Sequence, residues 1–174
     1  MPLRPPTIAA ALAVFAVPNA ALCHITLETQ RAVAGTAYKA VIRVPHGCDG
    51  SPTIAIRVRI PDGVSGVKPQ PKPGWSVNIV RAKLPAPVTN AHGHTVTEAV
   101  REIDWSGGRL PDDNYDEFVM RLELPDTPNV TLFFPIVQQC EKGVHRWIEI
   151  PEGGRPRSDD REPAASLRLL PKTR

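Results

Sequence analysis

The sequence of 174 residues carries 21 lysines and arginines against 18 aspartates and glutamates, which gives a net charge of +3. This near balance, with no basic stretch interleaved with aromatic residues, argues against a nucleic-acid-binding protein. Twenty prolines argue against a helical protein, because proline lacks an amide donor and breaks the interior of a helix. The composition therefore favours short strands joined by turns.

The first 23 residues have the pattern of a secretory signal peptide. A short basic start, Met1–Arg4, precedes the apolar run Thr7–Val17. This run is too short to span a bilayer, which needs about 20 residues, but it suits the apolar core of a leader. Cleavage after Cys23 would place small residues, Ala21 and Cys23, at the positions that a leader peptidase reads. We therefore expect export to the periplasm or the medium, and a mature chain that begins at His24.

Two other ways of processing the N-terminus are open but less favourable. Cleavage after Ala21 would place the larger Asn19 at the outer recognition position. Lipid attachment at Cys23 would require glycine or alanine before it, where this chain has Leu22.

The cysteine count agrees with removal of residues 1–23. Three cysteines leave one unpaired in an exported protein, whereas loss of the leader leaves only Cys48 and Cys140. An oxidising compartment allows these two to form a disulfide. The alternative is a pair of metal-binding thiols, although the spacing lacks the CxxC pattern that is typical of such sites.

Alternation of apolar and polar residues predicts eight short strands. The clearest is Thr53–Ile60, where Ile54, Ile56, Val58 and Ile60 share one face. Turn signals such as 106–108 (SGG) separate the strands, and no amphipathic helix is evident. This pattern predicts an all-β fold, an immunoglobulin-like antiparallel β-sandwich. The other expected strands are His24–Thr29, Tyr38–Val44, Trp75–Val80, Thr95–Trp105, Glu117–Leu124, Thr131–Gln138 and Val144–Ile150.

The mature chain of about 150 residues has the length of one domain. We expect the sandwich to occupy residues 24–151. Residues 152–174 are polar and rich in proline and glycine near their start, and we expect them to form a C-terminal tail. No second apolar run is long enough to span a membrane.

An N-terminal histidine is a distinctive metal ligand. The free α-amine of His24 and its imidazole Nδ1 could bind one ion in a chelate ring, which no internal residue can form. An α-amine has a pKa of about 7.7–8.0 and becomes an available donor near neutral pH. Nitrogen donors in a tetragonal arrangement favour Cu(II). The alternative is that His24 is merely the first residue of an edge strand.

The other histidines give weaker signals. His46 lies near a cysteine in a turn-like stretch, and His92 and His94 form HGH in an expected loop. His145 precedes Trp147 on one face of the last strand, where alternation places Val144, Ile148 and Ile150 on the opposite face. Either both faces of this strand are buried, or Trp147 lies over a site.

No catalytic motif is found. The sequence contains no GxSxG, GxxxxGK[ST], GxGxxG or HExxH pattern. The acidic stretch 112–117 lacks the spacing of a calcium-binding loop. We therefore expect a protein that is not an enzyme.

Five segments of the chain resemble the YcnI-like copper-binding domain, a bacterial exported family. They are HITLE, VPHGCDGSPT, VKPQPKPGW, HGHTVTEAVREIDWSGGRLPDDNYDEFVMR and FPIVQQCEKGVHRWIEIP, and the resemblance runs from His24 to about Pro151. It implies an immunoglobulin-like sandwich and a Cu(II) site in which the mature N-terminal histidine binds through its amine and its imidazole.

Two parts of the family's site have counterparts here, and a third does not. The histidine corresponds to His24, and the tryptophan close to the metal corresponds to Trp147. The family's carboxylate follows the second strand, where this chain reads His46-Gly47-Cys48-Asp49. Asp49 is the first choice for this ligand, and Glu28, Glu141 and the nitrogen donor His46 are alternatives. The implied role is periplasmic copper homeostasis, with the ion passed to other copper-trafficking proteins.

Two alternative functions belong to different classes. A copper mono-oxygenase of the histidine-brace type would need a second histidine beside His24. A metal-free interaction module could use the loop Val64–Trp75 as its contact surface.

Overall fold

The computed structural model describes residues 24–89, 93, 95–152 and 162–172. In these residues the chain forms β-strands and no α-helix, so the described part contains no helix that could span a membrane. The strands are β1 (Thr26–Leu27), β2 (Arg31–Val33), β3 (Ala37–Val44), β4 (Thr53–Arg59), β5 (Ser65–Pro69), β6 (Ser76–Thr89), β7 (Thr95–Leu110), β8 (Asp116–Glu123), β9 (Thr131–Phe134), β10 (Ile136–Cys140), β11 (Val144–Trp147) and β12 (Ala165–Leu170).

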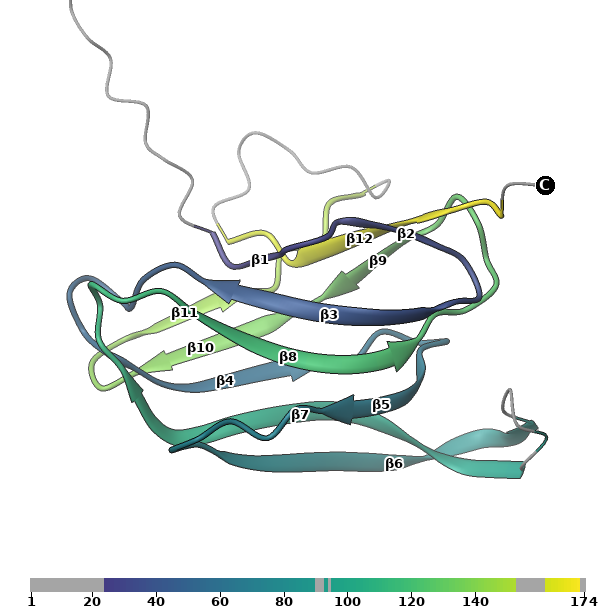
Figure 1. Ribbon diagram of the computed structural model, residues 1–174, viewed down its shortest axis with the longest axis horizontal. Coiled ribbons are helices and arrows are strands. Elements are labelled where there is room, and N and C mark those ends of the chain that lie inside the picture. Colours follow the sequence, from purple (N-terminus) through teal and green to yellow (C-terminus); the bar gives the residue numbers. More distant parts are fainter. Residues whose placement is uncertain (1–23, 90–92, 94, 153–161, 173–174) are drawn as a thin grey trace, which may run out of the picture.

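The strands form a sandwich of two larger sheets with a smaller sheet along one side (Figure 1). One layer has the order β1-β3-β8-β5 and the other the order β11-β10-β4-β7-β6. The smaller sheet has the order β2-β12-β9, in which β12 is parallel to β2 and antiparallel to β9. The expected all-β, immunoglobulin-like β-sandwich is confirmed.

Aromatic side chains join the two layers in the core. Trp105 of β7 lies 5.7 Å from Phe118 of β8, measured between ring centres, and Trp75 lies 4.9 Å from the same ring. Ile56 and Val58 of β4 are fully buried on the face that the sequence predicts. Alternation along each strand thus supplies one apolar face to a shared core.

The expected strand Thr131–Gln138 is divided at Pro135. Residues before it form β9 in the small sheet, and residues after it form β10 in the five-stranded layer. Proline cannot donate a ladder hydrogen bond, so the chain changes sheets at this position. The sequence predicts the apolar pattern correctly but not this change of partner.

The turn expected at 106–108 is wrong, because these residues lie inside β7. Gly107 has a φ of +81°, which a side chain would strain. At Gly108 the indole of Trp75 covers the backbone, and an ideal Cβ would lie 2.1 Å from Trp75 Cε2. Gly107 therefore supplies a positive φ, and Gly108 leaves space for the tryptophan.

The end of the chain is not only a polar tail. Residues 165–170 form β12, in which Leu167 and Leu169 are fully buried. The charged stretch before β12 hides this short apolar alternation from a composition-based prediction. The expectation of a tail from residue 152 is therefore corrected for β12, which belongs to the sandwich.

Two more strands lie outside the eight that were expected. The short β2 gains its place through pairing with β12, and β5 lies in the stretch expected to form a loop over Val64–Trp75. Because Trp75 packs on Phe118, this stretch contributes to the fold as well as to the surface.

The disulfide between Cys48 and Cys140 is confirmed. It joins the segment after β3 to the end of β10 across 92 residues of sequence. A loop of this length corresponds to a stabilisation on the order of 4–5 kcal/mol in the chain-entropy treatment. Because both sulfur atoms are in the bridge, neither cysteine offers a thiolate to a metal.

We expect Gly108→Ala to lower the free energy of unfolding by about 1–3 kcal/mol, the usual cost of overpacking. Urea unfolding measures this change. In a Trp75→Val background the same substitution should cost clearly less, because the added methyl group then has space. An equal cost in both backgrounds would show that the contact with Trp75 is not the cause.

Candidate metal centre

His24 lies beside the buried indole of Trp147. The ring centres of the two side chains are 5.3 Å apart and their planes are inclined by 56°. His24 precedes Ile25, which is buried, and β1, which pairs with β3. These contacts fix the start of the sandwich next to β11, where Trp147 is only 4% exposed.

Trp147 is held by the side chain of Gln138, which is 1% exposed. The indole Nε1–H donates to Gln138 Oε1 at 3.1 Å. Gln138 Nε2 donates to the backbone oxygen of His46 at 2.7 Å and to Thr53 Oγ1 at 2.8 Å. One buried amide therefore fixes the tryptophan of β11 and the loop that carries His46.

A second histidine contacts the same indole. The ring of His145 lies 5.1 Å from that of Trp147, with the planes inclined by 36°. His145 Nδ1 lies 2.7 Å from Glu162 Oε1, and the ring of His46 lies 6.3 Å from that of His145. All three described histidines thus belong to one chain of ring contacts around Trp147.

The candidate carboxylates lie elsewhere. Asp49 has a φ of +49° and, with Gly50, forms a two-residue turn closed by backbone hydrogen bonds between Cys48 and Ser51. Glu141 accepts a hydrogen bond from Arg109 Nε at 2.7 Å. Asp49 and Glu141 line a common hollow of about 460 Å³ beside the disulfide.

Among the described residues, no recorded hydrogen bond, ion pair or ring contact joins His24 to Asp49, Glu141 or Glu28. The backbone of Glu28 bonds to Val41 of β3. Nor does a recorded ring contact join His24 directly to His46 or His145. His92 and His94 lie outside the described residues.

The two faces of β11 have different surroundings. Trp147 points into the sandwich, whereas Val144, Ile148 and Ile150 are 44%, 44% and 54% exposed. The sequence left open whether both faces of this strand are buried, and that alternative is wrong.

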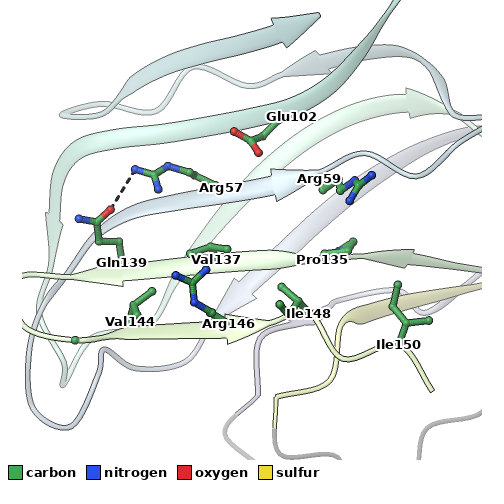
Figure 2. Close-up of a pocket in the computed structure, with 11 residues that line it drawn as sticks. Arg57, Arg59, Glu102, Pro135, Val137, Gln139, Val144, Arg146, Ile148 and Ile150 are labelled. Carbon is green, nitrogen blue, oxygen red and sulfur yellow. Dashed lines mark hydrogen bonds between the residues drawn. The ribbon is translucent and has the colours of Figure 1, made fainter. Parts of the chain in front are cut away.

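A groove of about 840 Å³ runs over the outer face of β11, β10 and β4 (Figure 2). Arginine and aliphatic side chains line it, and Arg57 donates to Gln139 Oε1 at 3.1 Å within it. None of the predicted ligands lines this groove. Its lining residues are Arg57, Arg59, Glu102, Pro135, Val137, Gln139, Gly143, Val144, Arg146, Ile148 and Ile150.

The contacts that sequence reasoning missed are those made by Gln138 and Glu162. Gln138 occupies an inward position of β10, where a polar residue in an apolar alternation was a usable signal. Glu162 lies in the charged stretch before β12, and nothing local distinguishes it from its neighbours.

These features define an immunoglobulin-like β-sandwich that is closed by a disulfide and carries histidines around a buried tryptophan. A family model described as "Domain of unknown function (DUF1775)" matches residues 24–169, and the chain belongs to this family.

The comparison of structures supports the fold. A crystal structure of an uncharacterized protein from Nocardia farcinica, described as having an immunoglobulin-like fold, is 25% identical in sequence. The match has a TM-score of 0.63 and covers 85% of this chain and 99% of that chain. No curated protein sequence matches significantly.

We expect Gln138→Leu to lower the free energy of unfolding by about 3 kcal/mol, because each buried polar group left without a partner costs roughly 1–3 kcal/mol. The substitution leaves the Trp147 indole N–H and the His46 carbonyl oxygen without their hydrogen-bond partner. Gln139→Leu on the opposite face of the same strand is the matched control and should change stability by less than about 0.5 kcal/mol. Equal losses in urea unfolding would contradict a special role for Gln138.

Proposed function

We propose that the chain is an exported copper-binding protein that holds Cu(II) through His24 after removal of residues 1–23. The observation that carries the proposal is the position of the His24 imidazole beside the buried Trp147 indole. The family match also begins at residue 24. DUF1775 is the YcnI-like family that the chain resembles.

The chemistry of His24 suits a copper ion. An N-terminal histidine supplies an amine and an imidazole from one residue, and nitrogen donors in a tetragonal arrangement favour Cu(II). Such a site does not need three clustered side chains. In the described part of the chain, no group of three or more histidine, cysteine, aspartate or glutamate side chains is arranged to hold a metal.

The remaining ligand is proposed from the sequence. Asp49 is the first choice from the sequence, and Glu28, Glu141 and His46 are the alternatives. Of these, His46 is linked to Trp147 through the amide of Gln138, which bonds to both residues.

Trp147 would act as a neighbour of the metal rather than as its main ligand. Its indole lies beside the His24 imidazole, with ring centres 5.3 Å apart. An indole face can also attract a cation through its quadrupole. We propose a non-enzymatic role in periplasmic copper homeostasis, in which the protein holds the ion and passes it to other copper-trafficking proteins.

We expect His24→Ala to weaken Cu(II) binding by the mature protein by more than roughly 100-fold, beyond the 10- to 100-fold typical for loss of an outer-shell partner. Competition with a chelator of known affinity measures the change. One extra residue before His24 is the matched variant, because it keeps the imidazole but removes the terminal amine, and it should cause a similar loss.

Intact mass of the exported protein checks the processing on which the proposal depends. The expected chain starts at His24 and gains two daltons when its disulfide is reduced. An exported chain that starts elsewhere, or unchanged Cu(II) affinity after His24→Ala, would overturn the proposal.

A further inference from the structure

The groove on the outer face of the sandwich has no part in the proposed copper site. It lies over β4, β10 and β11, at one edge of the five-stranded sheet, and has a volume of about 840 Å³ (Figure 2). Trp147 is buried on the opposite face of β11, and none of the proposed copper ligands lines the groove. The groove can therefore be occupied whether or not His24 binds copper.

Aliphatic side chains gather along the groove. Val137 of β10 lies between its two sides, and Val144, Ile148 and Ile150 lie on the side next to the edge of the sheet. The last three are 44%, 44% and 54% exposed. Single exposed apolar side chains are ordinary on a protein surface. Several of them in one concave site are typical of a surface that another molecule covers.

Arginine side chains stand on both sides of the groove. Arg57 and Arg59 extend from β4, and Arg146 extends from β11. In the register of the three strands, Arg57 and Arg146 are the two neighbours of Val137. Three arginines and one glutamate, Glu102, belong to the lining. The lining therefore carries an excess of positive charge.

Two of the three guanidinium groups are available to another molecule. Arg57 is engaged, because it donates to Gln139 Oε1 at 3.1 Å and its Nε lies 3.6 Å from Asp104 Oδ1. Within the described part of the chain, the guanidinium groups of Arg59 and Arg146 make no hydrogen bond or ion pair. A guanidinium group can bind a carboxylate through two parallel hydrogen bonds. The groove thus offers two carboxylate-binding groups beside an aliphatic surface.

We propose that the groove binds an extended segment of a partner protein that carries both acidic and aliphatic residues. Its carboxylates would bind Arg59 and Arg146, and its aliphatic side chains would cover Val137 and Ile148. Arginine is enriched at protein–protein interfaces and among the residues that contribute most to binding. A segment of about eight residues, extended at roughly 3.3 Å per residue, is about 26 Å long and can follow β11 and the residues after it.

This segment would be recognised by side chains and not by addition of a strand to the sheet. β11 is an edge strand, and an exposed edge can pair with a peptide. Here the edge is already covered in part. Glu162 Oε2 accepts from the Arg146 N–H, and backbone hydrogen bonds join Glu149 to Glu162 and Ala164. The face of the sheet is therefore the more accessible surface.

An anionic membrane suits the groove less well than a protein segment does. The headgroups form a broad surface that would not reach into a concave site, and Glu102 would repel their negative charge. A narrow segment can place its carboxylates at Arg59 and Arg146 and keep uncharged side chains next to Glu102. Charge and shape thus favour the protein segment.

Selection from a displayed library of random peptides of about eight residues, the length that matches the groove, tests the proposal. The bait is the disulfide-bonded chain from His24 to Arg174, with no added metal. Bound peptides should be enriched in aspartate or glutamate and in aliphatic residues, relative to the starting library. A synthetic peptide of the enriched sequence then gives the affinity by fluorescence polarisation, and this affinity should fall as salt is added. No enrichment, or enrichment without acidic residues, would overturn the proposal.

Charge reversal locates the binding site of this synthetic peptide. Arg59→Glu combined with Arg146→Glu should weaken binding by roughly tenfold or more, because like charges that face each other across an interface are strongly unfavourable. Lys39→Glu combined with Lys68→Glu is the matched control. It makes the same change in net charge at exposed positions of β3 and β5, in the other layer, and should leave the affinity nearly unchanged. Equal losses would show that net charge alone attracts the peptide and would overturn the proposal.

A valine substitution tests the aliphatic part of the groove. Val144→Ser should weaken binding of the peptide several-fold, because less apolar surface is then removed from water. Val88→Ser in β6 is the control, since Val88 is 49% exposed, close to the 44% of Val144, but lies outside the groove. Thermal unfolding shows that each variant is folded. Equal affinity of the two variants would contradict the proposed contact.

Two other occupants have separate readouts. Vesicles of phosphatidylglycerol and phosphatidylcholine that bind the wild type, but not the variant with Arg59→Glu and Arg146→Glu, would assign the groove to a membrane surface. A dimer in sedimentation that the same variant dissociates would assign it to a second copy of the chain. Either result would overturn the proposal. His24→Ala, which tests the proposed function, should leave peptide binding unchanged, so the two proposals can fail independently.

Discussion

The hydrogen bonds of Gln138 are the constraint on which the candidate metal centre depends. Its amide lies in the interior of the sandwich and satisfies the Trp147 indole, the His46 carbonyl and the Thr53 hydroxyl. A buried amide with fewer partners would destabilise the fold, so Gln138 couples the positions of these three groups. The disulfide fixes the same region covalently, since Cys140 follows Gln138 by two residues and Cys48 follows His46 by two. A hydrogen-bonded network and a covalent bridge thus give the histidines a rigid base.

The alternation of side chains along β11 explains why this strand contributes both to the candidate metal centre and to the outer groove. Trp147 and His145 point toward the inner network, whereas Val144 and Arg146 belong to the outer groove. A strand with a polar–aromatic inner face and a partly aliphatic outer face departs from the usual pattern of apolar inside and polar outside. This departure is the reason that the sequence leaves two readings of Trp147 open. Of these readings, burial of both faces is wrong, because only the inner face of β11 is covered by the core.

Local patterns predict most of this fold, and non-local contacts account for what they miss. Alternation identifies β3, β4 and β8 almost to the residue, and the cysteine count identifies the disulfide. Whether Pro135 ends a strand or moves it to another sheet depends on which partners lie nearby, and a single sequence does not contain that information. Gly108 illustrates the same limit: the reason for a glycine there is the indole of Trp75, more than thirty residues away in the sequence. At the candidate centre, the pattern identifies His24 and Trp147, but their contact, and those made by Gln138 and Glu162, arise only on folding.

The C-terminal segment connects the stability of the sandwich with the environment of the histidines. Burial of Leu167 and Leu169 in β12 anchors the end of the chain between β2 and β9. Burying one such side chain contributes about 1.5–3 kcal/mol, which can offset the entropy lost when the preceding residues are ordered. Those residues include Glu162, whose carboxylate orients His145. Hydrophobic burial in β12 therefore helps to hold the partner of an imidazole on β11, and a chain that ended at residue 151 would keep His145 but lose its contact with Glu162.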